Sequence, residues 1–155
     1  MARYRASIFF KPGFPLEKKL KCIEIITSKF EGDRVYSGEF VLTEELLGVL
    51  YANLKRKDDQ ALWKATRSAF LNEKVYVLTL LVEENGGIEE LVELIGKDVD
   101  PEKCEEGSLR HMFGDGKKLI PNSLYYWFFN WIHRPRTEEE ARTQFKAFFP
   151  DGTDA

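Results

Sequence analysis

The stretch KVYVLTLLV, residues 74–82, is apolar at nearly every position. This pattern favours a central β-strand that is covered on at least one face, and we expect cover on both. A second run, YRASIFF at residues 4–10, is rich in β-formers and ends at the turn signal Lys11-Pro12-Gly13. It is therefore predicted as a strand that leaves Lys11 at its end.

Further strands and helices follow from turn signals and from apolar residues that recur every three or four positions. Strands are predicted at residues 34–42, with Gly38 as a bulge, and at residues 124–129. Helices are predicted at residues 16–30, 43–54, 60–71, 88–95 and 137–149. The order predicts an α+β fold with a ferredoxin-like core: a four-stranded antiparallel sheet, helices on one face, and a helical hairpin added after the second strand.

Composition and charge exclude several classes of protein. The 155 residues are 43% hydrophobic and 32% charged, which fits a single domain spanning residues 1–155. A net charge of −3 gives no general attraction to nucleic acid or an anionic membrane, so neither is expected as a partner. The cysteines Cys22 and Cys104 form no disulfide framework or metal-ligand cluster, and no metal site on the protein is expected. Without a leader-like segment or an apolar run of ~18 residues, the chain is expected to be cytoplasmic.

A well-signalled helix start lies near the carboxyl end. Thr137 is a good N-cap, and Glu140 stands three residues later as in a capping box. Pro135 disfavours a helical Arg134, so His133 is predicted on a turn just before a helix N-terminus, where an anion can bind. A histidine in that place could be a nucleophile, a general base or merely a packed side chain.

Three short motifs narrow these alternatives. They are Lys11-Pro12, Gly107-Ser108-Leu109-Arg110 and Asn130-Trp131-Ile132-His133. In order and rough spacing they resemble the nucleoside diphosphate kinases, which carry K-P-x-G, G-T-I-R and N-x-x-H with a phosphorylated histidine. Each motif is weak or moderate alone, and their joint occurrence favours the resemblance over the packed side chain.

The resemblance implies an activity and a set of roles. The γ-phosphoryl group of a nucleoside triphosphate would pass to a nucleoside diphosphate through a phosphohistidine on His133, with ping-pong kinetics. Lys11 and Arg110 would hold phosphate oxygens, and Asn130 would meet the sugar. Tyr51 would lie close to the histidine and the lysine. The resemblance further implies Mg²⁺ bound through the nucleotide phosphates, and a homo-oligomer (hexamer, tetramer or dimer).

Several positions depart from the family pattern. His133 is followed by Arg134-Pro135-Arg136, where the family has G-S-D. The glutamate that orients the family's imidazole falls on Gln144, whose carbonyl can still accept a hydrogen bond from the ring. The family's phosphate-binding arginine falls on Val92, and a nearby threonine falls near Asp98.

The two new arginines suggest a compensation. Arg134 and Arg136 are predicted to bind nucleotide and to restore the cationic charge lost at position 92. The alternative is that they are surface charges that pair with residues 138–140. The departures also keep open a second function, a catalytically weak or inactive kinase-fold domain that acts as a nucleotide-binding or regulatory oligomeric protein.

The segment between Arg110 and Asn130 is longer than is usual in the family. It contains most of the aromatic run YYWFFNW, residues 125–131, which resembles a base-stacking platform but has few basic residues around it. Core packing or a subunit interface is favoured, and we expect an oligomer contact. A plain oligomeric interaction protein that binds no nucleotide is the third alternative.

Overall fold

The computed structural model describes residues 2–57 and 60–153. Its centre is a pair of antiparallel strands, β1 (Arg3–Phe10) and β4 (Lys74–Glu83), which are paired from Arg3↔Glu83 to Phe10↔Tyr76. Both strands were predicted from their apolar patterns, and both are confirmed. The α+β fold with its antiparallel sheet is confirmed with them.

Short strands complete the sheet on both edges. They are β2 (Glu31–Gly32) and β3 (Gly38–Val41), which both pair with β4, and β7 (Ile132–His133), which pairs with β1. The strand order is β2-β4-β1-β7, with β3 also on β4. The single strand expected at residues 34–42 is therefore broken. Its first part forms the 3-10 turn η1 (Arg34–Tyr36), because the Asp33 carboxylate accepts a hydrogen bond from the Val35 amide.

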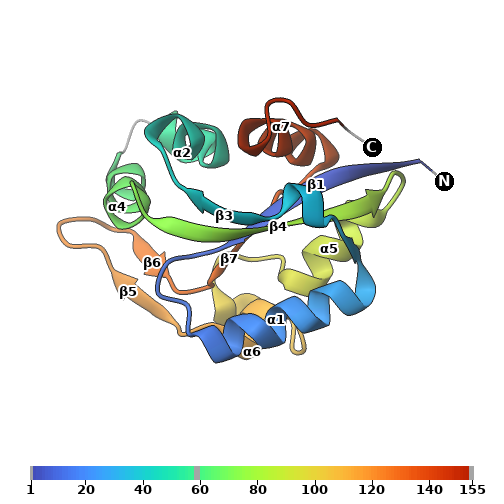
Figure 1. The fold of residues 1–155 in the computed structure, drawn as a ribbon. Helices are drawn as coiled ribbons and strands as arrows, with labels where there is room; N and C mark the ends of the chain where they lie inside the picture. Colours follow the sequence, from blue (N-terminus) through green and yellow to red (C-terminus); the bar gives the residue numbers. More distant parts are fainter. Residues whose placement is uncertain (1, 58–59, 154–155) are drawn as a thin grey trace.

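Helices cover both faces of the sheet, whereas the sequence predicted them on one. In Figure 1, α1 (Leu16–Lys29), α5 (Gly87–Ile95) and α6 (Leu109–Phe113) lie below it, and α2 (Glu44–Leu50), α4 (Ala61–Phe70) and α7 (Glu138–Phe148) lie above it. The reason is that β1 alternates between two cores: Ile8 and Phe10 pack below, and Phe9 packs above. Apolar residues on both faces need two covering layers.

The helix expected at residues 43–54 bends at Tyr51. This residue ends α2 and precedes α3 (Ala52–Lys55), with the non-helical dihedrals φ −121° and ψ 37°. Thr43 caps α2 as predicted, since its hydroxyl accepts a hydrogen bond from the Leu46 amide. The helical hairpin after the strands is thus confirmed, and Tyr51 bends its first arm between α2 and α3.

The region between Arg110 and His133 differs most from the prediction. The strand expected at residues 124–129 does not join the main sheet; it is shortened to β6 (Tyr126–Phe128) and pairs with β5 (Lys117–Leu119) in a separate hairpin. We call residues 117–128 the aromatic hairpin. His133 was expected on a turn, but it lies in β7, because Trp131 adopts a left-handed conformation (φ 66°) and returns the chain to the edge of β1.

Among the described helices, none is long and apolar enough to cross a membrane.

Candidate active site

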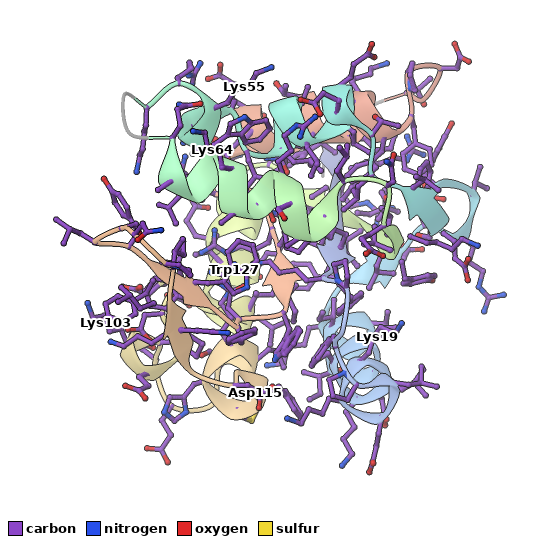
Figure 2. All side chains as sticks on the ribbon, turned by 90° about the vertical axis from the view of Figure 1, so that its left-hand side faces the viewer. Lys19, Lys55, Lys64, Lys103, Asp115 and Trp127 are labelled. Atoms are coloured by element: carbon purple, nitrogen blue, oxygen red, sulfur yellow. The ribbon has the colours of Figure 1, made fainter. Side chains whose placement is uncertain are left out.

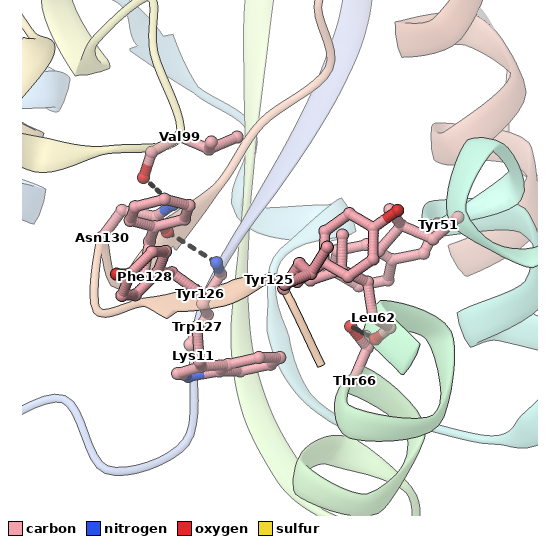
Figure 3. A pocket seen from close by; sticks show the side chains of 12 residues that line it. Lys11, Tyr51, Leu62, Thr66, Val99, Tyr125, Tyr126, Trp127, Phe128 and Asn130 are labelled. Carbon is pink, nitrogen blue, oxygen red and sulfur yellow. Dashed lines mark hydrogen bonds between the residues drawn. The ribbon is translucent and has the colours of Figure 1, made fainter. Parts of the chain in front are cut away.

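Strand pairing brings together residues that are far apart in the sequence. Phe9 pairs with His133, and the Lys11 amide donates a hydrogen bond of 2.8 Å to the Trp131 carbonyl. The Lys11 ammonium then donates to Asn130 Oδ1 at 2.6 Å, and Asn130 Nδ2 donates to the Val99 carbonyl at 2.8 Å. Figure 3 shows this chain of two hydrogen bonds on one side of a pocket.

His133 lies in an aromatic enclosure next to this chain. Its ring stacks on Phe9 with centroids 4.9 Å apart and planes 17° apart, and it contacts Tyr51 at 4.9 Å with planes 60° apart. On the α7 side, Nε2 lies 3.0 Å from Oε1 of Gln144. The packing fixes the ring plane. Because Nε2 contacts Gln144, Nδ1 is the ring nitrogen left for a different contact.

The charge state of His133 follows from its surroundings. Burial, together with the cations Lys11, Arg110 and Arg134, lowers the pKa of His133 to about 3, although the hydrogen bond to Gln144 opposes the shift. The imidazole is therefore neutral near pH 7, and one ring nitrogen carries a free lone pair. A neutral ring among cations can act as a nucleophile toward an anion.

Lys11 is also shifted. Desolvation, with a smaller contribution from Arg110, lowers the pKa of Lys11 to about 7. Its ammonium carries three donor protons, of which the bond to Asn130 uses one. A phosphate oxygen would supply both the remaining hydrogen bonds and the negative charge that favours the protonated form.

Arg110 is buried, and backbone carbonyls accept hydrogen bonds from it. Nη1 donates to Asp98 at 3.0 Å and to Gly96 at 3.4 Å, and Nη2 donates to Ile132 at 2.8 Å. The guanidinium therefore joins the loop after α5 to the strand that carries His133. Its Nε, like the Tyr51 hydroxyl and Arg134 Nε, is a buried polar atom without a hydrogen-bond partner among the described residues. These groups are donors that an anion could use.

The predicted roles of Arg134 and Arg136 receive unequal support. Arg134 is buried, and its Nη2 donates to the Gly96 carbonyl at 2.7 Å and to the Lys97 carbonyl at 3.3 Å. Arg136 is exposed and pairs with Glu140 at 3.2 Å, as the alternative reading of these residues predicted. Both side chains are thus held by protein groups, and nucleotide binding by them stays a prediction.

Gly96 allows this clustering. It ends α5 as predicted, with φ +134°, and its carbonyl accepts from both buried arginines. A Cβ at this position would lie 2.9 Å from Arg110 Cβ and from Cys104 Sγ. Only glycine lets the loop approach Arg110 so closely.

The loop after α5 has its own hydrogen bonds. Asp98, which falls near the family's threonine, accepts through its carboxylate from the Asp100 amide at 2.9 Å. Val92, which falls on the family's arginine, is half-buried in α5. Neither side chain replaces the lost phosphate contacts.

A cavity of about 330 Å³ opens beside Lys11 and Asn130. Its lining comes from the helical hairpin, the loop after α5 and the aromatic hairpin: Lys11, Tyr51, Leu54, Leu62, Thr66, Val99, Leu124, Tyr125, Tyr126, Trp127, Phe128 and Asn130. In Figure 3, Leu62 and Thr66 lie on the side of the pocket opposite Asn130 and Val99. Among the residues that the structure describes, those that line this cavity include no carboxylate.

The aromatic hairpin thus has a position that the sequence did not predict. Trp127 packs on Phe70 of α4 with centroids 5.4 Å apart, and Figure 2 shows it on the face that also carries Lys64 and Asp115. Tyr126 is 42% exposed, and Leu124 is 94% exposed. The hairpin lines the cavity and keeps an exposed edge, so its expected oligomer contact stays a prediction.

Comparison with solved structures settles the fold. This chain matches the nucleoside diphosphate kinase of Aquifex aeolicus with a TM-score of 0.69 and 21% identity, over 96% of each chain. The nucleoside-diphosphate kinase of Borrelia burgdorferi, solved with bound vanadate and ADP as a transition state mimic, matches with a TM-score of 0.70 and 18% identity over 99% of this chain and 90% of that one. The chain has the nucleoside diphosphate kinase fold.

A third match supports the same fold. The nucleoside diphosphate kinase of Encephalitozoon cuniculi matches with a TM-score of 0.68 and 19% identity, over 96% of this chain and 90% of that one. No protein-family model matches the chain, and no curated protein matches it in sequence. The nucleoside diphosphate kinase fold is therefore found here in a divergent sequence.

Proposed function

We propose that the chain transfers the γ-phosphoryl group of a nucleoside triphosphate to a nucleoside diphosphate through a phosphohistidine on His133. The observation that carries this proposal is the state of that ring. It is neutral, its Nε2 is held by Gln144 at 3.0 Å, and the cations around it include Lys11 and Arg110. The fold of solved nucleoside diphosphate kinases supports the same reading.

The chemistry would proceed in two half-reactions. The lone pair of Nδ1 forms a bond to the γ-phosphorus while the bond to the β,γ-bridging oxygen breaks, and the nucleoside diphosphate leaves with that electron pair. The ring then carries positive charge, and its Nε2–H donates to the Gln144 carbonyl. A second nucleoside diphosphate takes the phosphoryl group by the reverse steps.

The remaining residues would bind and neutralise the phosphates. Lys11 donates to the γ-phosphate oxygens, the Tyr51 hydroxyl donates near the ring, and Arg110 adds positive charge from behind it. Mg²⁺ would be held by the phosphates of the nucleotide, and it would neutralise part of their charge. The base would lie against the aromatic hairpin, since aromatic side chains stack on any nucleobase.

The test is direct labelling of the protein. Incubation with γ-labelled ATP and Mg²⁺ should give an acid-labile, base-stable label that added nucleoside diphosphate removes. His133→Ala should abolish the label. His111→Ala is the matched control, because His111 is the other histidine of the chain and is exposed on α6, so the label should persist.

A second function is favoured by one observation. Arg110 and Arg134 both donate hydrogen bonds to backbone carbonyls, so their observed role is to hold the loop after α5 in place. A kinase-fold domain that binds nucleotide without transferring phosphate would fit this arrangement. It predicts no label on His133 together with a rise in melting temperature on addition of Mg-ADP. A homo-oligomer and a cytoplasmic location are part of either proposal.

A further inference from the structure

Three side chains connect the surface at the start of α7 to His133. Arg136 Nη2 lies 3.2 Å from Glu140 Oε2, and Gln144 Nε2 lies 3.4 Å from Glu140 Oε1. Gln144 Oε1 in turn lies 3.0 Å from His133 Nε2. Arg136, Glu140 and Gln144 are spaced four residues apart, so they follow one side of the helix and its entry. The line leads from an exposed arginine to a buried imidazole.

This connection decides which end of the Gln144 amide faces the histidine. The Glu140 carboxylate can only accept hydrogen bonds, so it favours the NH₂ end of Gln144. The reversed amide would place its oxygen against the carboxylate and an N–H against His133 Nε2. Arg136 donates to Glu140 Oε2 at 3.2 Å and so holds the carboxylate in place, which strengthens the preference.

The amide then decides the tautomer of the ring. The Gln144 oxygen can only accept, so the facing Nε2 of a neutral His133 must carry the proton. Nδ1 is left with its lone pair free. Lys11, Arg110 and Arg134, the cations near the ring, can only donate hydrogen bonds and therefore do not favour a proton on Nδ1.

We propose that Glu140, anchored by Arg136, is a positioning residue that fixes the Gln144 amide and so holds His133 in the Nε2–H tautomer. A fixed carboxylate at position 144 would do this without help, since both of its oxygens accept. With glutamine at 144 the chain needs a second group to choose the amide orientation, and Glu140 is that group. This role rests on the proposed phosphoryl transfer by His133.

The first readout needs no activity. Long-range ¹⁵N–¹H correlations of the imidazole near pH 7.5 distinguish the two neutral tautomers, and the His111→Ala background leaves only the His133 signals. The parent should show the Nε2–H tautomer. Glu140→Ala should shift the ring toward a mixture of tautomers. Glu139→Ala is the matched control, because Glu139 is exposed on the same turn, and it should keep the parental pattern.

A rescue separates this role from helix stability. In Glu140→Ala/Gln144→Glu, either oxygen of the carboxylate at position 144 can accept a hydrogen bond from Nε2–H. The double variant should therefore return to the Nε2–H tautomer. The rate of phosphoenzyme formation should change in parallel with the tautomer. Glu140→Ala should slow it about tenfold at unchanged Mg-ADP affinity, and the double variant should recover most of the rate.

Two results would overturn the proposal: the parental tautomer in Glu140→Ala, or a loss in that variant which Gln144→Glu does not repair. If no variant is ever labelled, the proposed phosphotransfer fails. The tautomer pattern would still decide the role of Glu140.

Discussion

The two halves of the candidate site were assembled in different ways. The histidine half comprises Lys11, Tyr51, Asn130, His133 and Gln144, and most of it lies on or next to paired strands β1 and β7. The ligand half is the cavity lining apart from Lys11, Tyr51 and Asn130, and it is drawn largely from the helical hairpin and the aromatic hairpin. His133 and Gln144 are not among the residues that line the cavity. Strand register fixes the first half to within hydrogen-bond distances. Loops and an insert form the second, and such segments change most easily without disturbing a fold.

The structure thus brings the predicted residues of the histidine half together, while the ligand half is formed by segments that the sequence did not place. In the histidine half, the expected neighbours of His133 are in place, with a glutamine for the glutamate. In the ligand half, a cavity wall is built from Tyr125 to Phe128, and outside it Val92 and Asp98 stand where the family has an arginine and a threonine. Each prediction below perturbs one half or the contacts next to it, and measures the effect on stability or on nucleotide affinity.

The largest effect is expected from Arg110→Met, which removes the hydrogen bonds that join the loop after α5 to β7, the strand of His133. The carbonyls of Gly96, Asp98 and Ile132 would lose their hydrogen bonds from Arg110, and the free energy of unfolding should fall by about 3 kcal/mol. The Gly96 carbonyl keeps the hydrogen bond from Arg134, and the Asp98 carbonyl keeps the one from Cys104. Denaturant unfolding measures this loss. Arg67→Met is the control, because Arg67 pairs with Glu44 at the surface and its removal should barely move the midpoint. If the two variants lost the same free energy of unfolding, the hydrogen bonds of Arg110 would not contribute to the stability of the site.

Acid should reveal the buried neutral histidine. The pKa of His133 is about 3 in the folded protein and near 6.5 in the unfolded chain, so the unfolded chain takes up the proton first. Stability therefore falls as the pH drops below about 6.5, by about 2 kcal/mol between pH 6.5 and pH 5. Denaturant unfolding at both pH values should show a smaller loss in His133→Gln than in the parent, while His111→Gln keeps the parental loss. If His133→Gln lost as much stability between pH 6.5 and pH 5 as the parent, water would have access to the ring of His133, and its pKa would be near the ordinary value.

In the ligand half, Trp127→Ala should weaken Mg-ADP binding by about tenfold, because stacking on an aromatic side chain contributes about 1–3 kcal/mol per base. Calorimetric titration measures the affinity. Leu119→Ala is a control within the aromatic hairpin, since Leu119 is on β5, is 50% exposed and does not line the cavity. Parental affinity in Trp127→Ala would place the base elsewhere, and the cavity wall would then serve another ligand.

Two features of the histidine half follow from short, local signals in the sequence, whereas Tyr51, Asn130 and Gln144 were assigned from the family resemblance. Strand patterns placed Lys11 at the end of β1, and the Thr137 cap holds as expected: its hydroxyl accepts from the Glu140 amide at 3.1 Å. The reciprocal half of the capping box did not form in the expected way. The Glu140 carboxylate contacts Arg136 and Gln144 instead, a choice that depends on residues which neighbour it only in three dimensions.

The ligand half could not be predicted for a related reason. Pro121 and the polar residues near Gly116 interrupt the apolar pattern, so the pairing of β5 with β6 leaves little trace in the sequence. The bonds of Arg134 to the loop after α5 span 37 and 38 residues and depend on the path of that loop. Local periodicity carries no information on such contacts.

The smallest effect is a pH dependence that spans both halves through Lys11. The pKa of Lys11 is about 7, so the free protein loses this cation as the pH rises through that value. If the ammonium binds phosphate, Mg-ADP affinity should fall about fivefold between pH 7 and pH 8, in proportion to the protonated fraction. Lys11→Arg should flatten this fall, because a guanidinium stays charged over the whole range. A parental fall that persists in Lys11→Arg would assign the titration to another group, and a flat parental profile would show that the ligand half binds nucleotide without the lysine.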